Sequence, residues 1–157
     1  MADIDKLCFG CMREKPDFSS ECPYCKYDAE KDSVENALPI KTLLQKRYYV
    51  GRTLNENGEG ITYIAYDALK ETPVRIREYF PMGMSQRINT LVKAFSEYGF
   101  TFDRGKQEFS ALARSLSHMN GFSGLLKILD IFEENGTAYY VTEYVEAITL
   151  RDFLLRN

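Results

Sequence analysis

The pattern of hydrophobic and polar positions predicts several strands before a single helix. Two segments rich in β-branched and aromatic residues, 47–54 and 61–66, are typical of strands. The link between them, 55–60, has the Asn and Gly content of a hairpin turn. A third strand is expected over 73–79, where a proline and a glycine follow shortly and end it.

The second half of the chain changes to a helical period and then returns to strands. Apolar residues recur at helical spacing over 103–119, and Asp103 stands where a helix N-cap is expected. Two further strands are expected over 126–132 and 137–143, on either side of an Asn-Gly turn. A short helix is expected over 148–155.

This order of elements predicts the fold class. Five strands and one main helix indicate an α+β fold, with a five-stranded antiparallel sheet and one helix layered on it. The less regular segment 84–102 is expected to form a loop or a small hairpin between the third strand and the helix.

Composition divides the 157 residues into three regions. Residues 1–31 hold all four cysteines and are expected to form a zinc ribbon. Residues 32–46 are expected to be a linker, because their apolar character is weak. Residues 47–157 carry the periodic pattern of a folded domain.

Charge and hydropathy exclude some functional classes. The formal net charge is −3 and the chain has no basic tract, which argues against a dedicated nucleic-acid binder. No apolar stretch reaches the length that a bilayer requires. The acidic N-terminus does not have the pattern of a signal peptide, so we expect a cytoplasmic location with reduced thiols.

The cysteines have the spacing of a metal site. They stand as C-x2-C, ten residues, C-x2-C, at Cys8, Cys11, Cys22 and Cys25. Two such pairs complete a tetrahedral set of four sulfurs that suits zinc, and four protein ligands make the site structural and not catalytic. A redox disulfide pair and an iron centre of the rubredoxin type are the alternatives. The metal would replace a core that about 30 residues cannot build.

Region 47–157 resembles the small lobe of a eukaryotic-type serine/threonine protein kinase, of the kind that bacteria encode behind a zinc ribbon. The resemblance rests on RYYVGRTLNENGEGITYIAYD, VRIREYFP, the helix ending in LSHMN, the hairpin DIFEENGTAYYVTEY, and VEAITLRDFL. It implies the same order of strands and helix that the periodicity predicts.

The resemblance places a degenerate nucleotide site on the chain. Kinases hold ATP phosphates under a G-x-G-x-x-G turn, whose three positions here are Asn55, Asn57 and Gly60, with Gly58 as an extra glycine. Two of the three glycines are therefore missing. An ordinary hairpin turn is at least as good an interpretation as a phosphate clamp.

The third strand departs from the kinase pattern V-A-I-K. It reads Val74-Arg75-Ile76-Arg77, and alternation places both arginines on one face. By the resemblance this is the nucleotide face. Arg77 replaces the lysine that pairs with phosphates, and Arg75 replaces a small alanine, so its long side chain would fill the space that adenine needs.

Two further places decide what the resemblance implies. Leu112 falls where the kinase helix offers a glutamate to that lysine, and leucine cannot pair with a cation. Thr142 occupies the gatekeeper position, and Glu143 with Val145 would offer hinge backbone groups to adenine. No H-R-D or D-F-G motif is present.

These departures predict a non-catalytic, pseudokinase-like small lobe with a structural zinc ribbon. Its expected role is protein–protein interaction or regulation, with a protein partner, the remainder of a longer chain, or a second copy of itself. The first alternative is the N-terminal part of a serine/threonine kinase that binds ATP and Mg²⁺ and is active only with a large lobe. The second alternative is a zinc-ribbon nucleic-acid binder.

Overall fold

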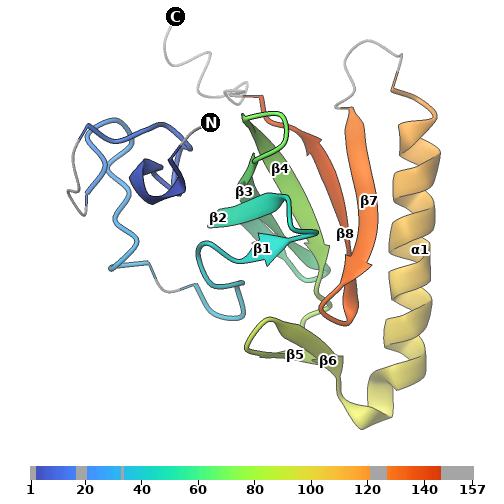
Figure 1. Cartoon of the computed structure of the whole chain (residues 1–157). Helices are drawn as coiled ribbons and strands as arrows, with labels where there is room; N and C mark the ends of the chain where they lie inside the picture. The colour runs from blue at the N-terminus through green and yellow to red at the C-terminus, as the bar shows by residue number, and fades with distance from the viewer. Residues whose placement is uncertain (1–2, 17–20, 33, 121–126, 146–157) are drawn as a thin grey trace, which may run out of the picture.

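A six-stranded antiparallel sheet organises the computed structural model, in which residues 3–16, 21–32, 34–120 and 127–145 are described. The strand order is β1-β2-β3-β4-β8-β7, and β5 and β6 form a separate hairpin (Figure 1). The strands are β1 (Leu43–Leu44), β2 (Tyr48–Asn57), β3 (Gly60–Asp67), β4 (Thr72–Tyr79), β5 (Ser85–Ile88), β6 (Leu91–Ala94), β7 (Ile128–Glu134) and β8 (Thr137–Glu143). The helices are the α-helix α1 (Gly99–Ser117) and the short 3-10 helices η1 (Ile4–Lys6) and η2 (Ser96–Tyr98).

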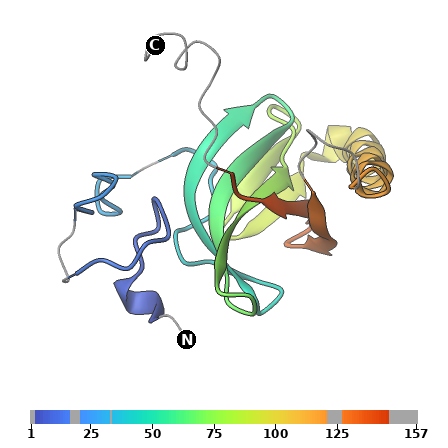
Figure 2. The ribbon, with the colours of Figure 1, turned by 90° about the horizontal axis from the view of Figure 1, so that it is seen from above.

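Helix α1 packs against β7 and β8 through aromatic side chains. The ring of Phe109 lies 5.7 Å from that of Tyr79 and 5.2 Å from that of Tyr140, measured between centroids. Figure 2 shows the sheet between the N-terminal segment and α1. The described part is thus mostly β with one long helix.

The sheet has six strands, so the expected count of five is wrong. The additional strand, β1, lies inside the segment 32–46 that was expected to be a linker. Leu44 is fully buried and pairs with Tyr48 of β2. Leu38 of the same segment is also in the core, and its backbone N–H donates to the Tyr63 hydroxyl at 3.0 Å. Burial of single leucines therefore orders a stretch whose overall apolar content is low.

The first hairpin is tighter than expected. Strands β2 and β3 extend through most of the predicted link and leave a turn at Gly58 and Glu59. The Asn57 side-chain oxygen accepts from the backbone N–H groups of Glu59 and Gly60 at 2.9 and 3.0 Å. Asparagine thus closes the turn with its own side chain, as it commonly does in short turns.

The helix begins at Gly99, one turn before the expected start, and Asp103 is not its N-cap. The N-cap residue, Tyr98, makes no side-chain capping hydrogen bond. Phe102 explains the early start, because this buried side chain packs 5.2 Å from the Tyr79 ring.

The segment 84–102 and the last two strands can also be compared with the predictions. Within 84–102, the alternative of a small hairpin is confirmed by β5 and β6. Strand β8 has the expected bounds, and β7 is displaced by two residues. The expected helix over 148–155 lies outside the described residues.

A carboxylate–guanidinium pair lies inside the main hydrophobic core. Glu78 of β4 is fully buried and pairs with Arg87 of β5, whose side chain is 8% exposed. The Glu78 carboxylate also accepts from the hydroxyls of Tyr63 and Tyr139 at 2.8 and 2.6 Å. Burial and the negative charge of Glu78 raise the pKa of both tyrosines, so their hydroxyls stay protonated and donate. The network ties the β5–β6 hairpin to the sheet.

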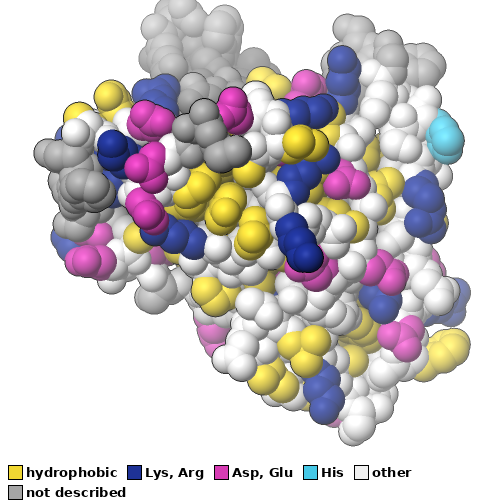
Figure 3. All heavy atoms as spheres, viewed as in Figure 1, with side chains coloured by type: hydrophobic (Ala, Val, Ile, Leu, Met, Phe, Trp, Pro, Cys, Tyr) yellow, Lys and Arg dark blue, Asp and Glu magenta, His cyan; other side chains and the backbone are white. Residues whose placement is uncertain are grey.

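A second hydrophobic cluster joins the N-terminal segment to the sheet. Leu7, Phe9 and Met12 pack there against Ile64 and Tyr66 of β3. In Figure 3, hydrophobic side chains gather where the N-terminal segment meets the sheet, and basic and acidic groups alternate around them. No helix in the described ranges combines the length and apolar character that a membrane span requires.

Candidate functional site

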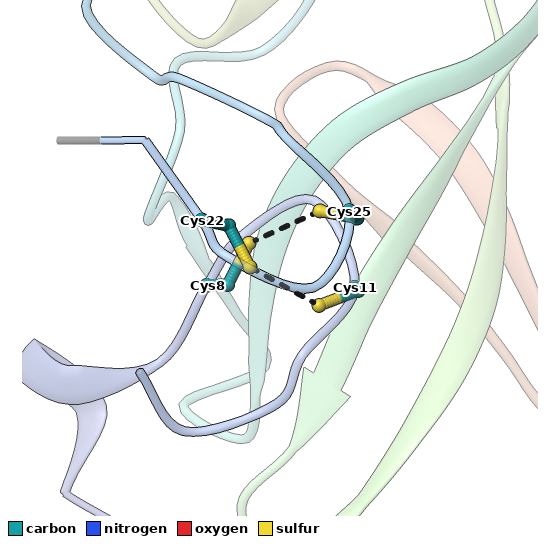
Figure 4. A group of neighbouring side chains, drawn as sticks. All are labelled: Cys8, Cys11, Cys22 and Cys25. Atoms are coloured by element: carbon teal, nitrogen blue, oxygen red, sulfur yellow. Dashed lines mark hydrogen bonds between the residues drawn. The ribbon is translucent and has the colours of Figure 1, made fainter. Parts of the chain in front are cut away.

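The four cysteines meet in one place, as their spacing predicts. All four sulfur atoms lie within 4.8 Å of one another. The Sγ atoms of Cys8 and Cys25 are 3.6 Å apart, and those of Cys11 and Cys22 are 3.9 Å apart (Figure 4). A tetrahedron with Zn–S bonds of about 2.3 Å has edges of about 3.8 Å. The sulfurs are thus compatible with one tetrahedral zinc ion, which they would hold as a closed structural centre.

The two cysteine pairs are built as matching turns. The N–H of Gly10 donates to the Cys8 sulfur at 3.3 Å, and the N–H of Tyr24 donates to the Cys22 sulfur at 3.4 Å. One residue beyond each second cysteine, the backbone adopts positive φ and bonds back to the carbonyl of the first cysteine. Backbone donors aimed at sulfur favour the thiolate, the form that binds a metal.

The thiols differ in acidity because their surroundings differ. Burial raises the pKa of Cys8, and it raises the pKa of Cys11 to about 12. Burial also acts upward on Cys22, but the backbone N–H groups of Cys25 and Tyr24 outweigh it and lower the Cys22 pKa to about 7. Without a metal, Cys8 and Cys11 therefore carry protons at neutral pH.

Zinc affinity is accordingly expected to rise steeply with pH. Cys8 and Cys11 must each lose a proton to become ligands, so we expect at least about a hundredfold gain in zinc affinity per pH unit near neutrality. Below the Cys22 pKa of about 7, a further proton must leave and the slope increases. Competition with a chromophoric chelator at several pH values measures this slope. A gain in zinc affinity of less than about tenfold per pH unit, which corresponds to fewer than one proton released, would contradict the raised pKa values of Cys8 and Cys11.

The turn positions predicted to meet phosphate lie at the tip of the β2–β3 hairpin. Asn55 is exposed on β2, and Gly58 has open space around its α-carbon. Gly60 has another role: a Cβ there would lie 2.5 Å from the Glu78 backbone oxygen. Close strand packing thus explains this glycine without a nucleotide.

Arg75 and Arg77 share one face of the sheet, as alternation predicts. Val74 and Ile76 point into the main core, while Arg75 pairs with Ile64, and Arg77 with Thr62, across β3 and β4. We call the side of β3 and β4 that carries Thr62, Ile64, Arg75 and Arg77 the arginine face.

Neutral groups of the chain itself engage Arg77. Its guanidinium donates to the Asn57 side-chain oxygen at 2.8 Å and to the Thr62 hydroxyl at 3.0 Å. Arg75 lies beside the end of β8, with its guanidinium carbon 5.8 Å from the centre of the Tyr144 ring. Its Nε is buried without a hydrogen-bond partner in the described structure.

The helix presents leucine where the resemblance expects glutamate. Leu112 is 62% exposed and lines an apolar cleft of about 550 Å³ between α1 and the tip of the β2–β3 hairpin. Glu108, one turn earlier, pairs with Arg104 at 3.3 Å. The two acceptors of Arg77 are an amide and a hydroxyl oxygen, not a carboxylate.

The predicted hinge residues stand at the end of β8. Thr142 is buried and pairs with Arg75 across β4 and β8, which brings it to the arginine face. Glu143 closes the strand, and its N–H donates to the Lys127 carbonyl at 3.3 Å. Val145 is 45% exposed. The structure thus gathers Asn57, Thr62, Arg75, Arg77 and Thr142 on or beside one sheet face.

Sequence reasoning missed two features of this region. The Glu78–Arg87 pair was not predicted, although Glu78 stands in phase with the core residues Val74 and Ile76, a visible signal. The packing of Phe9 and Met12 against β3 was not predicted either, because no periodicity marks a contact between two separate modules.

Comparison with known proteins supports a kinase-related fold. No family model and no curated protein matches the chain. Among solved structures, PpkA-294 in its apo form is similar, with a TM-score of 0.70 and 31% sequence identity over 78% of this chain. The present chain spans 43% of that chain. PpkA is a bacterial serine/threonine kinase.

Proposed function

We propose that the chain is a non-catalytic, kinase-like small lobe that acts in protein–protein interaction or regulation, with a structural zinc ribbon attached. The observation that carries this proposal is the engagement of Arg77 by Asn57 and Thr62. Arg77 stands in the position that pairs with phosphates in kinases. Its guanidinium already has hydrogen-bond acceptors in the β2–β3 hairpin, whose turn would otherwise cover the phosphates. By the resemblance, the long side chain of Arg75 would fill the space that adenine needs.

The apolar cleft beside α1 favours an interaction role. Its lining includes the exposed side chain of Leu112 and the half-buried side chains of Phe109 and Met84. Exposed apolar surface of this kind is typical of a site that another protein surface covers. The partner is a separate protein, a second copy of this chain, or a further part of a longer polypeptide.

One observation favours a second candidate function. The chain spans less than half of the PpkA-294 chain, 43%. The region would then be the N-terminal part of a serine/threonine kinase that binds ATP and Mg²⁺ and is active only with a large lobe. In this case Arg77 would have to leave Asn57 and turn to the phosphates.

Thermal unfolding with Mg·ATP separates the two candidates. We expect no change in the melting temperature of the zinc-loaded chain at millimolar Mg·ATP. The double variant Arg75→Ala with Arg77→Lys removes one obstruction and restores the ammonium, so it should gain stability in Mg·ATP. Ligand at about one hundred times its Kd adds about 2.7 kcal/mol, a shift of several degrees.

The control is Arg114→Ala, which removes an exposed arginine from α1 and should respond to Mg·ATP like the wild type. A rise in the wild-type melting temperature would favour the second candidate. If neither the wild type nor the double variant responds, the obstruction by the arginines is not what prevents binding.

A further inference from the structure

The first cysteine turn lies directly on the sheet. The backbone oxygen of Phe9, the residue that follows the ligand Cys8, accepts from the N–H of Arg52 in β2 at 2.8 Å. The approach is so close that a Cβ on Gly51 would lie 2.4 Å from the Phe9 oxygen and 2.5 Å from the Met12 side chain. Glycine at position 51 is therefore what permits the contact.

Apolar side chains and two basic side chains lie around the hydrogen bond between Arg52 and Phe9. Phe9 and Met12 pack on Ile64 of the arginine face and on Tyr66 next to it. The ammonium of Lys41 lies 5.6 Å from the centre of the Phe9 ring. On the second turn, the Arg52 guanidinium lies 5.9 Å from the centre of the Tyr27 ring.

The covered area reaches the edge of the predicted nucleotide region. Tyr144, which follows β8 and contacts the guanidinium of Arg75, packs against the same cluster as Phe9 and Met12. Leu54 of β2 packs there as well. The N-terminal module, by which we mean residues 3–16 and 21–32, thus covers the arginine face from the side of the hinge residues.

The metal would fix the residues that make this contact. Phe9 stands between the ligands Cys8 and Cys11, and the N–H of Met12 donates to the Cys8 carbonyl at 2.6 Å. A turn held by two thiolates on zinc holds Phe9 and Met12 in place. A turn without metal loses this restraint, since a segment of this size has too little core of its own.

We infer that the first cysteine turn is a metal-dependent cover for the arginine face: zinc binding docks Phe9 and Met12 on β2 and β3, and metal loss uncovers Ile64, Tyr66 and Tyr144. The inference goes beyond the proposed function, because the coupling holds whether or not a nucleotide binds. It makes the exposure of this sheet face respond to zinc supply.

Hydrogen exchange at two neighbouring amides tests the cover directly. The Arg52 amide bonds to Phe9 of the module, whereas the Val50 amide bonds to the Thr42 carbonyl at 2.8 Å and serves as the internal reference. Removing zinc with a chelator should speed exchange at Arg52 by roughly tenfold or more, while Val50 stays protected. Equal protection of Arg52 with and without zinc would overturn the inference.

Coupling is reciprocal, so disturbing the docking site must weaken zinc binding. Gly51→Ala places a methyl group against Phe9 and Met12 without touching a cysteine, and we expect zinc affinity to fall roughly tenfold. Gly99→Ala, where a Cβ meets nothing within 4 Å, is the matched control. Equal zinc affinities of the two variants would also overturn the inference.

Protection of the β8 amides shows whether Gly51→Ala has damaged the sheet itself. If that protection is lost, Met12→Ala replaces it as the test, since it removes docking contacts from the module side and leaves β2 intact. The same fall in zinc affinity is then expected, and wild-type affinity in Met12→Ala would refute the coupling.

Discussion

The variant Glu78→Gln is expected to lose about 3–5 kcal/mol of unfolding free energy, because it leaves the guanidinium of Arg87 buried without its carboxylate. The Arg87 side chain is 8% exposed, and Glu78 is not exposed at all. Water therefore cannot replace the lost partner. Such a loss is a large part of the stability of a domain of this size. Urea unfolding of the zinc-loaded chain, followed by near-UV circular dichroism, measures the change.

The control is an ion pair on the surface. Arg104 and Glu108 are 71% and 70% exposed, so Glu108→Gln should cost less than about 1 kcal/mol. The double variant Glu78→Leu with Arg87→Met removes both charges and should lose less than the sum of the two single changes. A loss for Glu78→Gln as small as that for Glu108→Gln would show that the buried network does not stabilise the fold.

The variant Cys11→Ser is expected to unfold the N-terminal module, whose described residues are 3–16 and 21–32, at neutral pH. Structural zinc supplies apparent binding energies of about 10–16 kcal/mol in small modules, and here it would replace a core. The buried apolar residues of the module, Leu7, Phe9 and Met12, pack on the sheet and not on one another alone. The expected results are loss of bound zinc and rapid amide exchange throughout the module, while β4 and β8 remain protected.

A serine substitution inside the second turn provides the matched control. Tyr24 stands between Cys22 and Cys25, is 55% exposed, and leaves all four sulfurs in place when it is changed to Ser. This variant should keep one zinc ion per chain. Full zinc content and native amide protection in Cys11→Ser would contradict a four-sulfur centre. Iron in the purified wild-type protein would show that the site is of the rubredoxin type and not a zinc site.

Strands and faces with a regular residue pattern were predictable from the sequence. Very short strands and contacts between residues far apart in the chain were not. Strand β8 follows from the Asn-Gly turn before it, and the shared face of Arg75 and Arg77 follows from alternation along the third strand. Strand β1 has two residues, which is too short for any periodicity to show. The helix start was missed because Phe102, a residue packed on a distant strand, fixes it rather than a capping side chain.

The candidate sites divide in the same way. Cysteine spacing predicted that the four sulfurs come together, because two tight turns carry all of them. The hydrogen bonds of Arg77 could not be predicted. They depend on how far strand pairing extends along the β2–β3 hairpin, because this pairing brings Asn57 within reach of Arg77. The cover formed by Phe9 depends on a contact between separate modules, for which the sequence holds only the small residue Gly51 as a signal.

Titration of the zinc-loaded, isotope-labelled chain with Mg·ATP, followed by NMR, tests the central claim most directly. The amides of Arg75, Arg77 and Thr142 report on the arginine face where a nucleotide would lie. We predict that their resonances do not move up to millimolar nucleotide. Saturable shifts of these amides with a Kd below about 1 mM would show an open nucleotide site and contradict the claim.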